Sequence, residues 1–286
     1  MSRASLPMDG MPVLVVPCMR VDDVSVLSGT SVIGPPQPST FLGWGHLMER
    51  KLGAGPVRGV AMAMHSFSMH HGFPKIPVDE AGAVRSGAGA GPIIEAPRAR
   101  MVASLLLALD VSRDEVQGVA ARAAAMLFGM RFAGGVIIDA GIAGADGNPG
   151  LPVVGCATPD AFRRVVFSLP GCAFLRDRSD LFQGSQDSLD TLLDAVGRTE
   201  MQEGVWRRGQ RGWVVPIQKG FRAISKVARR GGARDGDGVE GHVWAEEILG
   251  LGEWVSRARA WSSGMQGVFW SHTADRERGL YEAVAR

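Results

Sequence analysis

The feature that most constrains the fold is a strand–helix–strand pattern near the start of the chain. The apolar run Pro12–Pro17 (PVLVVP) has the length of a short buried strand, and its prolines suit the end or edge of a strand. Large and small apolar side chains alternate in Val57–Phe67, which predicts a second strand. Between them, Leu27–Leu52 leads through a proline-rich turn into a helix. A unit of this size is typical of a right-handed βαβ crossover.

The helix of this unit has signals at both ends. We expect Ser39 or Thr40 to cap its start with a side-chain oxygen, and Gly53 to close its end. An apolar stripe at helical spacing should pack on the sheet: Phe41, Trp44, Met48 and Leu52. Gly43 and Gly45 each cost about 1 kcal/mol relative to alanine in a helix. Close packing or the close approach of a ligand should therefore explain them.

The next segments repeat the pattern and indicate the fold class. The apolar run Arg100–Asp110 predicts a central strand. Ser112 and Glu115 form a capping-box pattern that opens a helix reaching Phe128, and Val136–Asp139 predicts another strand. The resulting order β-α-β-β-α-β predicts an α+β protein with a ferredoxin-like core.

Two stretches rich in glycine and proline divide the chain. Residues 70–97 show no sustained periodicity and predict a long insertion or an extended β-hairpin between the second and third strands. Residues 141–152 predict a linker. The core is therefore expected to span residues 12–140, and residues 141–286 to form a C-terminal α+β extension packed on it. In this extension, apolar runs or helix signals predict elements at Leu169–Arg176, Ser188–Val196 and Trp213–Ile217.

Charge and cysteine content narrow the function classes. The net charge is +2, and the basic residues are mostly arginines clustered at 98–100, 163–164, 207–211 and 219–234. Arginine clusters favour phosphate partners, although solvated surface is an equal alternative. The three cysteines are far apart, which favours neither a disulfide framework nor a zinc site and fits a cytoplasmic protein. The longest apolar run is much shorter than the roughly 20 residues that span a bilayer, so no membrane association is expected.

Catalytic and metal-binding motifs are absent from the sequence. There is no nucleophile elbow, P-loop, paired-histidine zinc helix or kinase signature. His65, His70 and His71 match no zinc spacing and favour structural or surface roles, so neither a metal nor another cofactor is expected. His46 in the first helix is a candidate general acid or base, although a histidine held by packing is the more common alternative.

Motifs along the whole chain occur in a specific order. They are LSGTSVIGPPQPSTFLGWGHLMERKL, RGVAMAMHSF, IIEAPRARMVASLLLAL, MRFAGGVII, LPGCAFLRDR, SLDTLLD, GWVVPIQKGFRAIS, EEILGLGEW and FWSHTADRERGLY. GWVVPI, GLGEW and the terminal GLY, in this order and spacing, are a fairly specific combination. On these motifs the chain resembles the family of second Csy subunits of type I-F CRISPR surveillance complexes, within the RAMP superfamily.

The resemblance implies a ferredoxin-like (RRM/RAMP) core in which the inserted hairpin, residues 70–97, is the family's thumb. It also implies a non-catalytic subunit that holds the 5′ handle of the CRISPR RNA in antiviral defence. The implied protein partners are the large Csy subunit and the backbone Csy subunits, and target DNA is reached through the assembled complex. RNA contacts would come from the first helix N-terminus, from arginines or a lysine that neutralise phosphates, and from a glycine turn. The positions expected to contact RNA are Ser39, Thr40, Arg98, Arg100, Arg131, Gly134, Gly135, Lys219 and Arg222.

Two alternatives remain open at this point. Some relatives in the superfamily cleave precursor CRISPR RNA without a metal ion, and His46 would then be the first candidate for the catalytic group. A third possibility is a subunit that itself contacts the duplex beside the protospacer.

Overall fold

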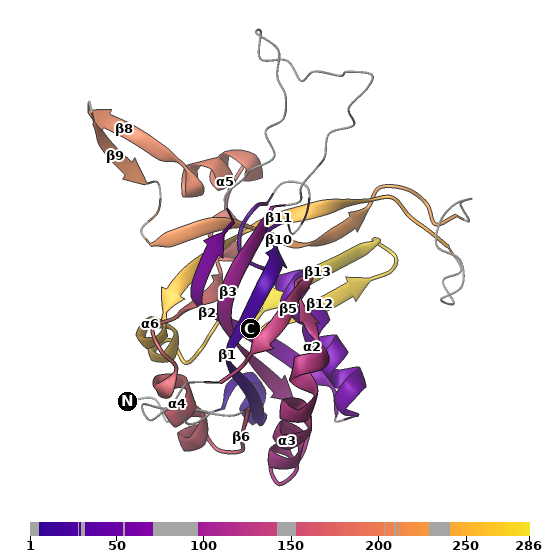
Figure 1. Cartoon of the computed structure of the whole chain (residues 1–286). Coiled ribbons are helices and arrows are strands. Elements are labelled where there is room, and N and C mark those ends of the chain that lie inside the picture. Colours follow the sequence, from indigo (N-terminus) through magenta and orange to yellow (C-terminus); the bar gives the residue numbers. More distant parts are fainter. Residues whose placement is uncertain are drawn as a thin grey trace, which may run out of the picture.

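The computed structural model describes residues 6–27, 29, 32–53, 55–70, 97–141, 153–202, 204–208, 210, 212–228 and 241–286. Along the chain the elements are α1 (Pro7–Gly10), β1 (Val13–Ser25), α2 (Pro38–Leu52), β2 (Val57–Met69), β3 (Arg98–Leu109), α3 (Val116–Met126), η1 (Leu127–Gly129), β4 (Arg131–Phe132), β5 (Gly135–Asp139), β6 (Val154–Cys156), α4 (Pro159–Ser168), β7 (Ala173–Asp177), η2 (Ser179–Phe182), α5 (Ser188–Val196), β8 (Arg198–Gln202), β9 (Val205–Arg208), β10 (Trp213–Ala223), β11 (Ala245–Ser256), α6 (Arg257–Ser262), β12 (Trp270–Asp275) and β13 (Leu280–Ala285) (Figure 1). The predicted α+β class is confirmed.

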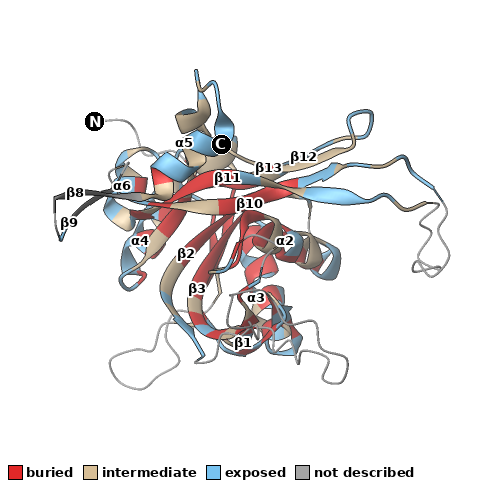
Figure 2. Ribbon diagram, turned by 90° about the horizontal axis from the view of Figure 1, so that it is seen from above, coloured by how far each residue is buried: buried red, intermediate tan, exposed pale blue. Residues whose placement is uncertain are grey.

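One large antiparallel sheet organises the described residues. Its strand order is β12-β13-β10-β11-β7-β2-β3-β1-β5-β4, and β6 also pairs with β1. One edge of β2 pairs with β3, and two strands share the other edge: Val60 pairs with Trp270 of β12, and Ala63 pairs with Phe174 of β7. The sheet therefore curls until its C-terminal strands return to β2. Figure 2 shows the buried residues gathered on the central strands and on α2.

The strands predicted for the first half are confirmed, except that β1 is longer than expected. The strand was predicted to end at Pro17 but continues to Ser25. A shift in register between Val16 and Met19 places the proline at an irregularity, where Cys18 has a φ of 45°. A bulge of this kind tolerates a proline, because the local ladder hydrogen bond is already lost.

The predicted cap of α2 is wrong at its start and confirmed at its end. The helix begins at Pro38 with Gln37 in the N-cap position, and no side chain caps it. Ser39 and Thr40 lie inside the first turn. Gly53 closes the helix with a φ of 56°, and its N–H donates to the Glu49 carbonyl oxygen. Proline at the first helical position needs no N–H partner, which explains why the helix starts there.

The predicted apolar stripe of α2 is confirmed, since all four of its side chains are buried. Phe41 meets the ring of Trp270 edge-on at 6.5 Å between centroids, and Trp44 meets Phe132 in the same way at 6.1 Å. These contacts join the helix to the last strands and to the β4–β5 hairpin. Gly45 packs closely on Val60, since a Cβ there would lie 2.7 Å from Val60 Cγ2.

The helix after β3 begins later than predicted. Residues 113–115 form a turn, and α3 starts at Val116. The Ser112 N–H and hydroxyl both donate to the Glu115 carboxylate, at 3.0 and 2.7 Å. The capping-box residues therefore do contact each other, but they order the turn that precedes the helix. The helix ends at Met126 and a short 3-10 turn follows it.

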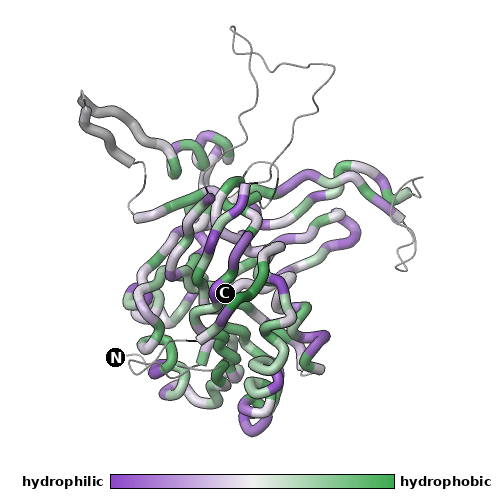
Figure 3. Tube along the Cα trace, in the orientation of Figure 1, coloured by the Kyte–Doolittle hydropathy of each residue, from purple (hydrophilic) through white to green (hydrophobic). Residues whose placement is uncertain are grey.

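The second half contains the predicted elements near residues 173–177, 188–196 and 213–223. Most of the expected thumb and of the expected linker lies outside the described residues. None of the described helices is long and apolar enough to cross a membrane. Figure 3 shows hydrophobic stretches along the central strands and a hydrophilic turn between β12 and β13.

Candidate nucleic-acid interface

Three of the predicted arginines and both predicted glycines meet at one corner of the sheet. We call this set, Arg98, Arg100, Arg131, Gly134 and Gly135, the arginine corner. Arg131 Nη1 donates to the Gly134 carbonyl oxygen at 3.1 Å. A Cβ at Gly134 would lie 3.5 Å from Arg98 Nη1. The start of β3 and the β4–β5 hairpin thus bring together residues that are more than thirty positions apart.

Backbone geometry accounts for the two glycines of the corner. Ala133 and Gly134 both have positive φ, 49° and 79°, as the two central residues of a tight hairpin turn require. A side chain at Gly135 would clash with the carbonyl oxygen of Asp22 on β1. The glycines are therefore needed to close the hairpin and to place it against β1, whether or not a ligand binds.

Carboxylates of β1 face the arginines of the corner. Arg100 Nε donates to Asp22 at 3.1 Å, and Arg98 lies 3.9 Å from the Asp23 carboxylate. The side chains of Arg98 and Arg100 are 39% and 74% exposed. Exposed ion pairs of this kind contribute about 0–1 kcal/mol. A phosphate group can therefore replace these carboxylates at little cost.

The predicted residues on α2 and β10 form a separate, more buried group. The Ser39 hydroxyl donates to Gln218 Oε1 at 2.5 Å, and the Gln218 N–H donates to Gln37 Oε1 at 3.0 Å. Within the first turn, the N–H groups of Thr40 and Phe41 both donate to the Gln37 carbonyl oxygen. The start of α2 is thus fastened to β10 and presents few free N–H groups to a ligand.

Lys219 does not lie on the surface as its predicted role requires. It is 6% exposed, and its ammonium group donates to Ser179 Oγ at 2.8 Å. The carboxylates of Asp177 and Glu282 lie 3.5 and 3.3 Å from it. This placement argues against Lys219 as an RNA contact, because the charge is already neutralised and enclosed. Arg222 is 64% exposed and pairs with Glu246 across the β10–β11 ladder.

A buried charge cluster escaped the sequence reasoning. Glu253 on β11 is fully buried and accepts hydrogen bonds from Arg176, Arg178 and Arg259. The hydrogen bond that Arg178 donates to Asp180 raises the pKa of Arg178, and the nearby Glu253 carboxylate raises it further. The available signal was a single carboxylate in the otherwise apolar motif GLGEWV. Because buried charges need partners, that glutamate predicts nearby cations.

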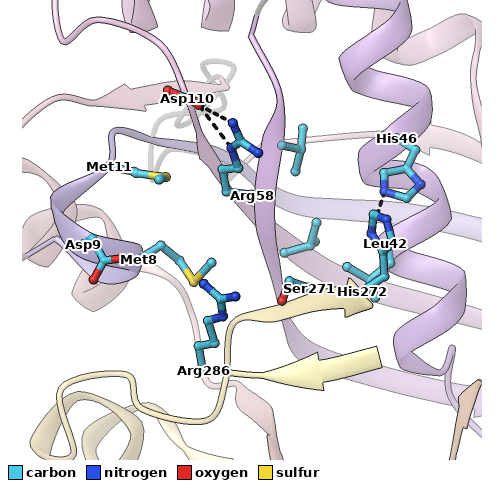
Figure 4. A pocket seen from close by; sticks show the side chains of 12 residues that line it. Met8, Asp9, Met11, Leu42, His46, Arg58, Asp110, Ser271, His272 and Arg286 are labelled. Carbon is cyan, nitrogen blue, oxygen red and sulfur yellow. Dashed lines mark hydrogen bonds and ion pairs between the residues drawn. The ribbon is translucent and has the colours of Figure 1, made fainter. Parts of the chain in front are cut away.

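His46 lines a cavity of about 520 Å³ between α2, β2, β12 and the two ends of the described chain (Figure 4). Its Nε2 lies 3.1 Å from Nδ1 of His272, and Arg58 pairs with Asp110 on the wall formed by β2 and the end of β3. Burial lowers the pKa of His46, and the neighbouring His272 lowers it further. A phosphodiester does not fit between two ring nitrogens in contact, so the two histidines are not arranged as an acid and base on either side of one.

His65 has a structural role in a chain of hydrogen bonds. Ser104 Oγ accepts the N–H of Cys18 at 2.8 Å and lies 2.7 Å from His65 Nε2; because a carbonyl oxygen beside His65 Nδ1 requires the proton on Nδ1, the Ser104 hydroxyl donates to Nε2. His65 Nδ1 then faces the carbonyl oxygen of Gly171 at 3.3 Å. Burial lowers the pKa of His65, which favours the neutral ring that this chain requires. In the part of the chain that the structure describes, no three metal-ligating side chains come together.

A second cavity of about 740 Å³, which we call the β2 groove, was not foreseen. Its walls come from residues 32–37 before α2, the end of β2, residues 171–175, the start of β10 and Trp254. Two tryptophans, Phe67 and several aliphatic side chains line it. The lining residues come from five separate segments, so no local sequence pattern predicts the groove.

Comparison with known proteins gives a consistent result over nearly the whole chain. The family model described as CRISPR-associated protein (Cas_Csy2) matches residues 14–283. The CRISPR-associated protein Csy2 of Pseudomonas aeruginosa (strain UCBPP-PA14) is 25% identical over 318 residues, which cover 96% of this chain and 95% of that protein.

Proposed function

The chain belongs to the Csy2 family of CRISPR-associated proteins, and on this basis we propose that it is a non-catalytic RNA-binding subunit of a type I-F Csy surveillance complex. In this role it holds the 5′ handle of the CRISPR RNA and pairs with the large Csy subunit. It abuts the backbone Csy subunits and takes part in RNA-guided recognition of target DNA through the assembled complex.

The proposed RAMP architecture is a ferredoxin-like core in residues 12–140. The strand order β2-β3-β1-β5 supports it, since each neighbouring pair is antiparallel and β1 lies between β3 and β5. Helices α2 and α3 pack on the same hydrophobic cluster, as the two crossover helices of such a core do. The proposed thumb, residues 70–97, connects the neighbouring strands β2 and β3. Residues 141–286 form the proposed C-terminal part.

The observation that carries the RNA-binding role is the convergence of Arg98, Arg100 and Arg131 in the arginine corner. Guanidinium groups bind phosphate oxygens with two parallel hydrogen bonds, and these three are held in place by neighbouring backbone and carboxylates. The adjoining Gly134 turn leaves room for a nucleic-acid backbone to approach closely. Arg222 provides a further exposed cation on a different part of the sheet.

The experiment is a salt titration of handle-RNA binding by the purified full chain. Each phosphate contact to single-stranded RNA contributes about 0.7 to the slope of log K against log salt. Arg98→Ala, Arg100→Ala and Arg131→Ala should each reduce the slope by about that amount. Arg122→Ala, at an exposed position on α3, is the matched control and should leave the slope unchanged. Asp22→Asn should strengthen binding, because it removes a competing carboxylate.

Binding of RNA without any salt dependence would contradict the proposal. So would equal slopes for the corner variants and the Arg122 control. Intrinsic fluorescence of the tryptophans checks that each variant is folded.

A metal-independent endoribonuclease that processes precursor CRISPR RNA is the alternative function. The observation in its favour is that His46 lies in a cavity with two arginines, Arg58 and Arg286. Incubating the protein with a repeat RNA in the presence of a chelator distinguishes the two proposals. A cyclic-phosphate product that is lost in His46→Ala would establish cleavage, whereas intact RNA with retained binding supports the non-catalytic role.

A further inference from the structure

Among the residues that the structure describes, the end of β2 has a strand partner on one side only. β3 pairs with β2 along its length, up to Met69. On the other side β7 reaches only Ala63 and Met64. Among the described residues, no strand pairs with this second edge from His65 to Met69. We call His65–Met69 the open edge of β2. Its backbone N–H and C=O groups present the pattern to which another extended chain can add.

The β2 groove lies directly beside this open edge, and its lining is uncharged. Met64, His65, Ser66, Phe67 and Met69 all contribute to the lining. None of the described residues that line it is aspartate, glutamate, lysine or arginine. The groove continues the main hydrophobic core outward, because Leu175 and Ile217 belong to both. An occupant therefore meets apolar walls on one side and a strand edge on the other.

Large apolar side chains are exposed around the mouth of the groove. Ile33 is 50% exposed, Met69 40% and Trp213 60%. Each comes from a different element and each lines the same cavity. Exposed tryptophan and aliphatic side chains around a concave surface are typical of protein interfaces, where they become buried anchors.

From this geometry we propose that an extended, uncharged segment of a neighbouring protein subunit adds as a strand to the open edge of β2. Its main chain hydrogen-bonds to His65–Met69, and its apolar side chains enter the β2 groove. A nucleic acid is the less suitable occupant, because its phosphates need cations that the groove lining does not supply. The proposal goes beyond RNA binding, since it assigns a protein partner to a surface separate from the arginine corner.

Amide hydrogen exchange on the full-length chain tests the proposal. The chain is measured alone, and then with the large Csy subunit, with the backbone Csy subunit or with handle RNA. Edge amides without a partner exchange quickly. One of the protein subunits should slow exchange of the 65–69 amides by about tenfold or more, as strand pairing does. Slowing by the RNA alone, or no slowing by either protein, would overturn the proposal.

Two pairs of variants matched for exposure show whether the β2 groove is responsible for binding the protein subunit. Ile33→Lys is compared with Ile138→Lys, at 50% and 53% exposure. Trp213→Ser is compared with Phe128→Ser, at 60% and 62% exposure. The groove variants should weaken binding of the protein subunit by about tenfold, the usual size of an anchor effect. The control variants should change it by less than about twofold.

Equal losses in the groove and control variants would refute the assignment of the groove. So would full binding by both groove variants. Because the salt dependence of RNA binding is measured separately on the same proteins, failure of this proposal is distinguishable from failure of the RNA-binding role.

Discussion

Adding one methyl group at each of two glycines in α2 should have opposite effects on stability. Alanine is about 1 kcal/mol better than glycine inside a helix. At Gly43 a Cβ would meet nothing within 4 Å, so Gly43→Ala should gain this amount. At Gly45 the Cβ would lie 2.7 Å from Cγ2 of Val60, which is fully buried. Overpacking of this kind costs about 1–3 kcal/mol, so Gly45→Ala should lose about 1 kcal/mol net.

Urea or thermal unfolding of the two variants measures the difference. A difference of about 2 kcal/mol corresponds to roughly 4–8 °C in unfolding temperature for a chain of this size. Adding Val60→Ala to Gly45→Ala should remove the overpacking, because it deletes the methyl group that the new Cβ would meet. A double-mutant cycle that includes Val60→Ala alone separates this interaction from the cost of the Val60 substitution itself. A Gly45→Ala protein as stable as Gly43→Ala would refute the close-packing explanation of Gly45.

Other predictions concern charged and titratable groups. Glu253→Gln should lower the free energy of unfolding by about 3–5 kcal/mol, because it leaves three guanidinium groups around a neutral side chain. The exposed control Glu246→Gln should cost less than about 1 kcal/mol, and equal losses in urea unfolding would contradict the reasoning. The folded chain lowers the pKa of His46, so the unfolded chain binds more protons. The contribution of neutral His46 to stability is present above pH 6.5, the ordinary histidine pKa, and is lost as the pH falls below that value. His46→Gln should therefore reduce the drop in unfolding temperature between pH 7 and pH 5. An unchanged drop would show that His46 does not contribute to this pH dependence. Asp187→Ala removes the N-cap of α5 and should cost about 1 kcal/mol, measured in the same way.

Local patterns in the sequence were sufficient for much of the secondary structure. Alternation of side-chain size placed β2, and the continuous apolar run placed β3, because both strands contribute to the buried centre of the sheet. The stripe on α2 was also predicted, since helical spacing and burial coincide there. Propensity was misleading at Pro17, where a bulge lets the strand continue through a proline. It also failed at Ser39, where tertiary contacts with β10 replaced the expected cap.

Long-range pairing accounts for what the sequence did not predict. His272 meets His46 only because the C-terminal strands return to β2, more than two hundred residues along the chain. Lys219 was expected to contact RNA, but carboxylates of Asp177 on β7 and Glu282 on β13 lie against its ammonium group. The arginine corner was only partly foreseeable. The sequence named its three arginines and two glycines together as expected RNA contacts, whereas the pairing of Arg100 with Asp22 and of Arg98 with Asp23 depends on the register of β1 with β3.

Sequencing the RNA that copurifies with the tagged full-length protein tests most directly the proposal that this chain holds the 5′ handle of a CRISPR RNA. We expect the reads to share a single short 5′ end derived from the repeat. Combining Arg98→Ala, Arg100→Ala and Arg131→Ala should strongly reduce the yield of this RNA. Reads with scattered 5′ ends, or the same yield from the triple variant as from Arg122→Ala, would contradict the proposal.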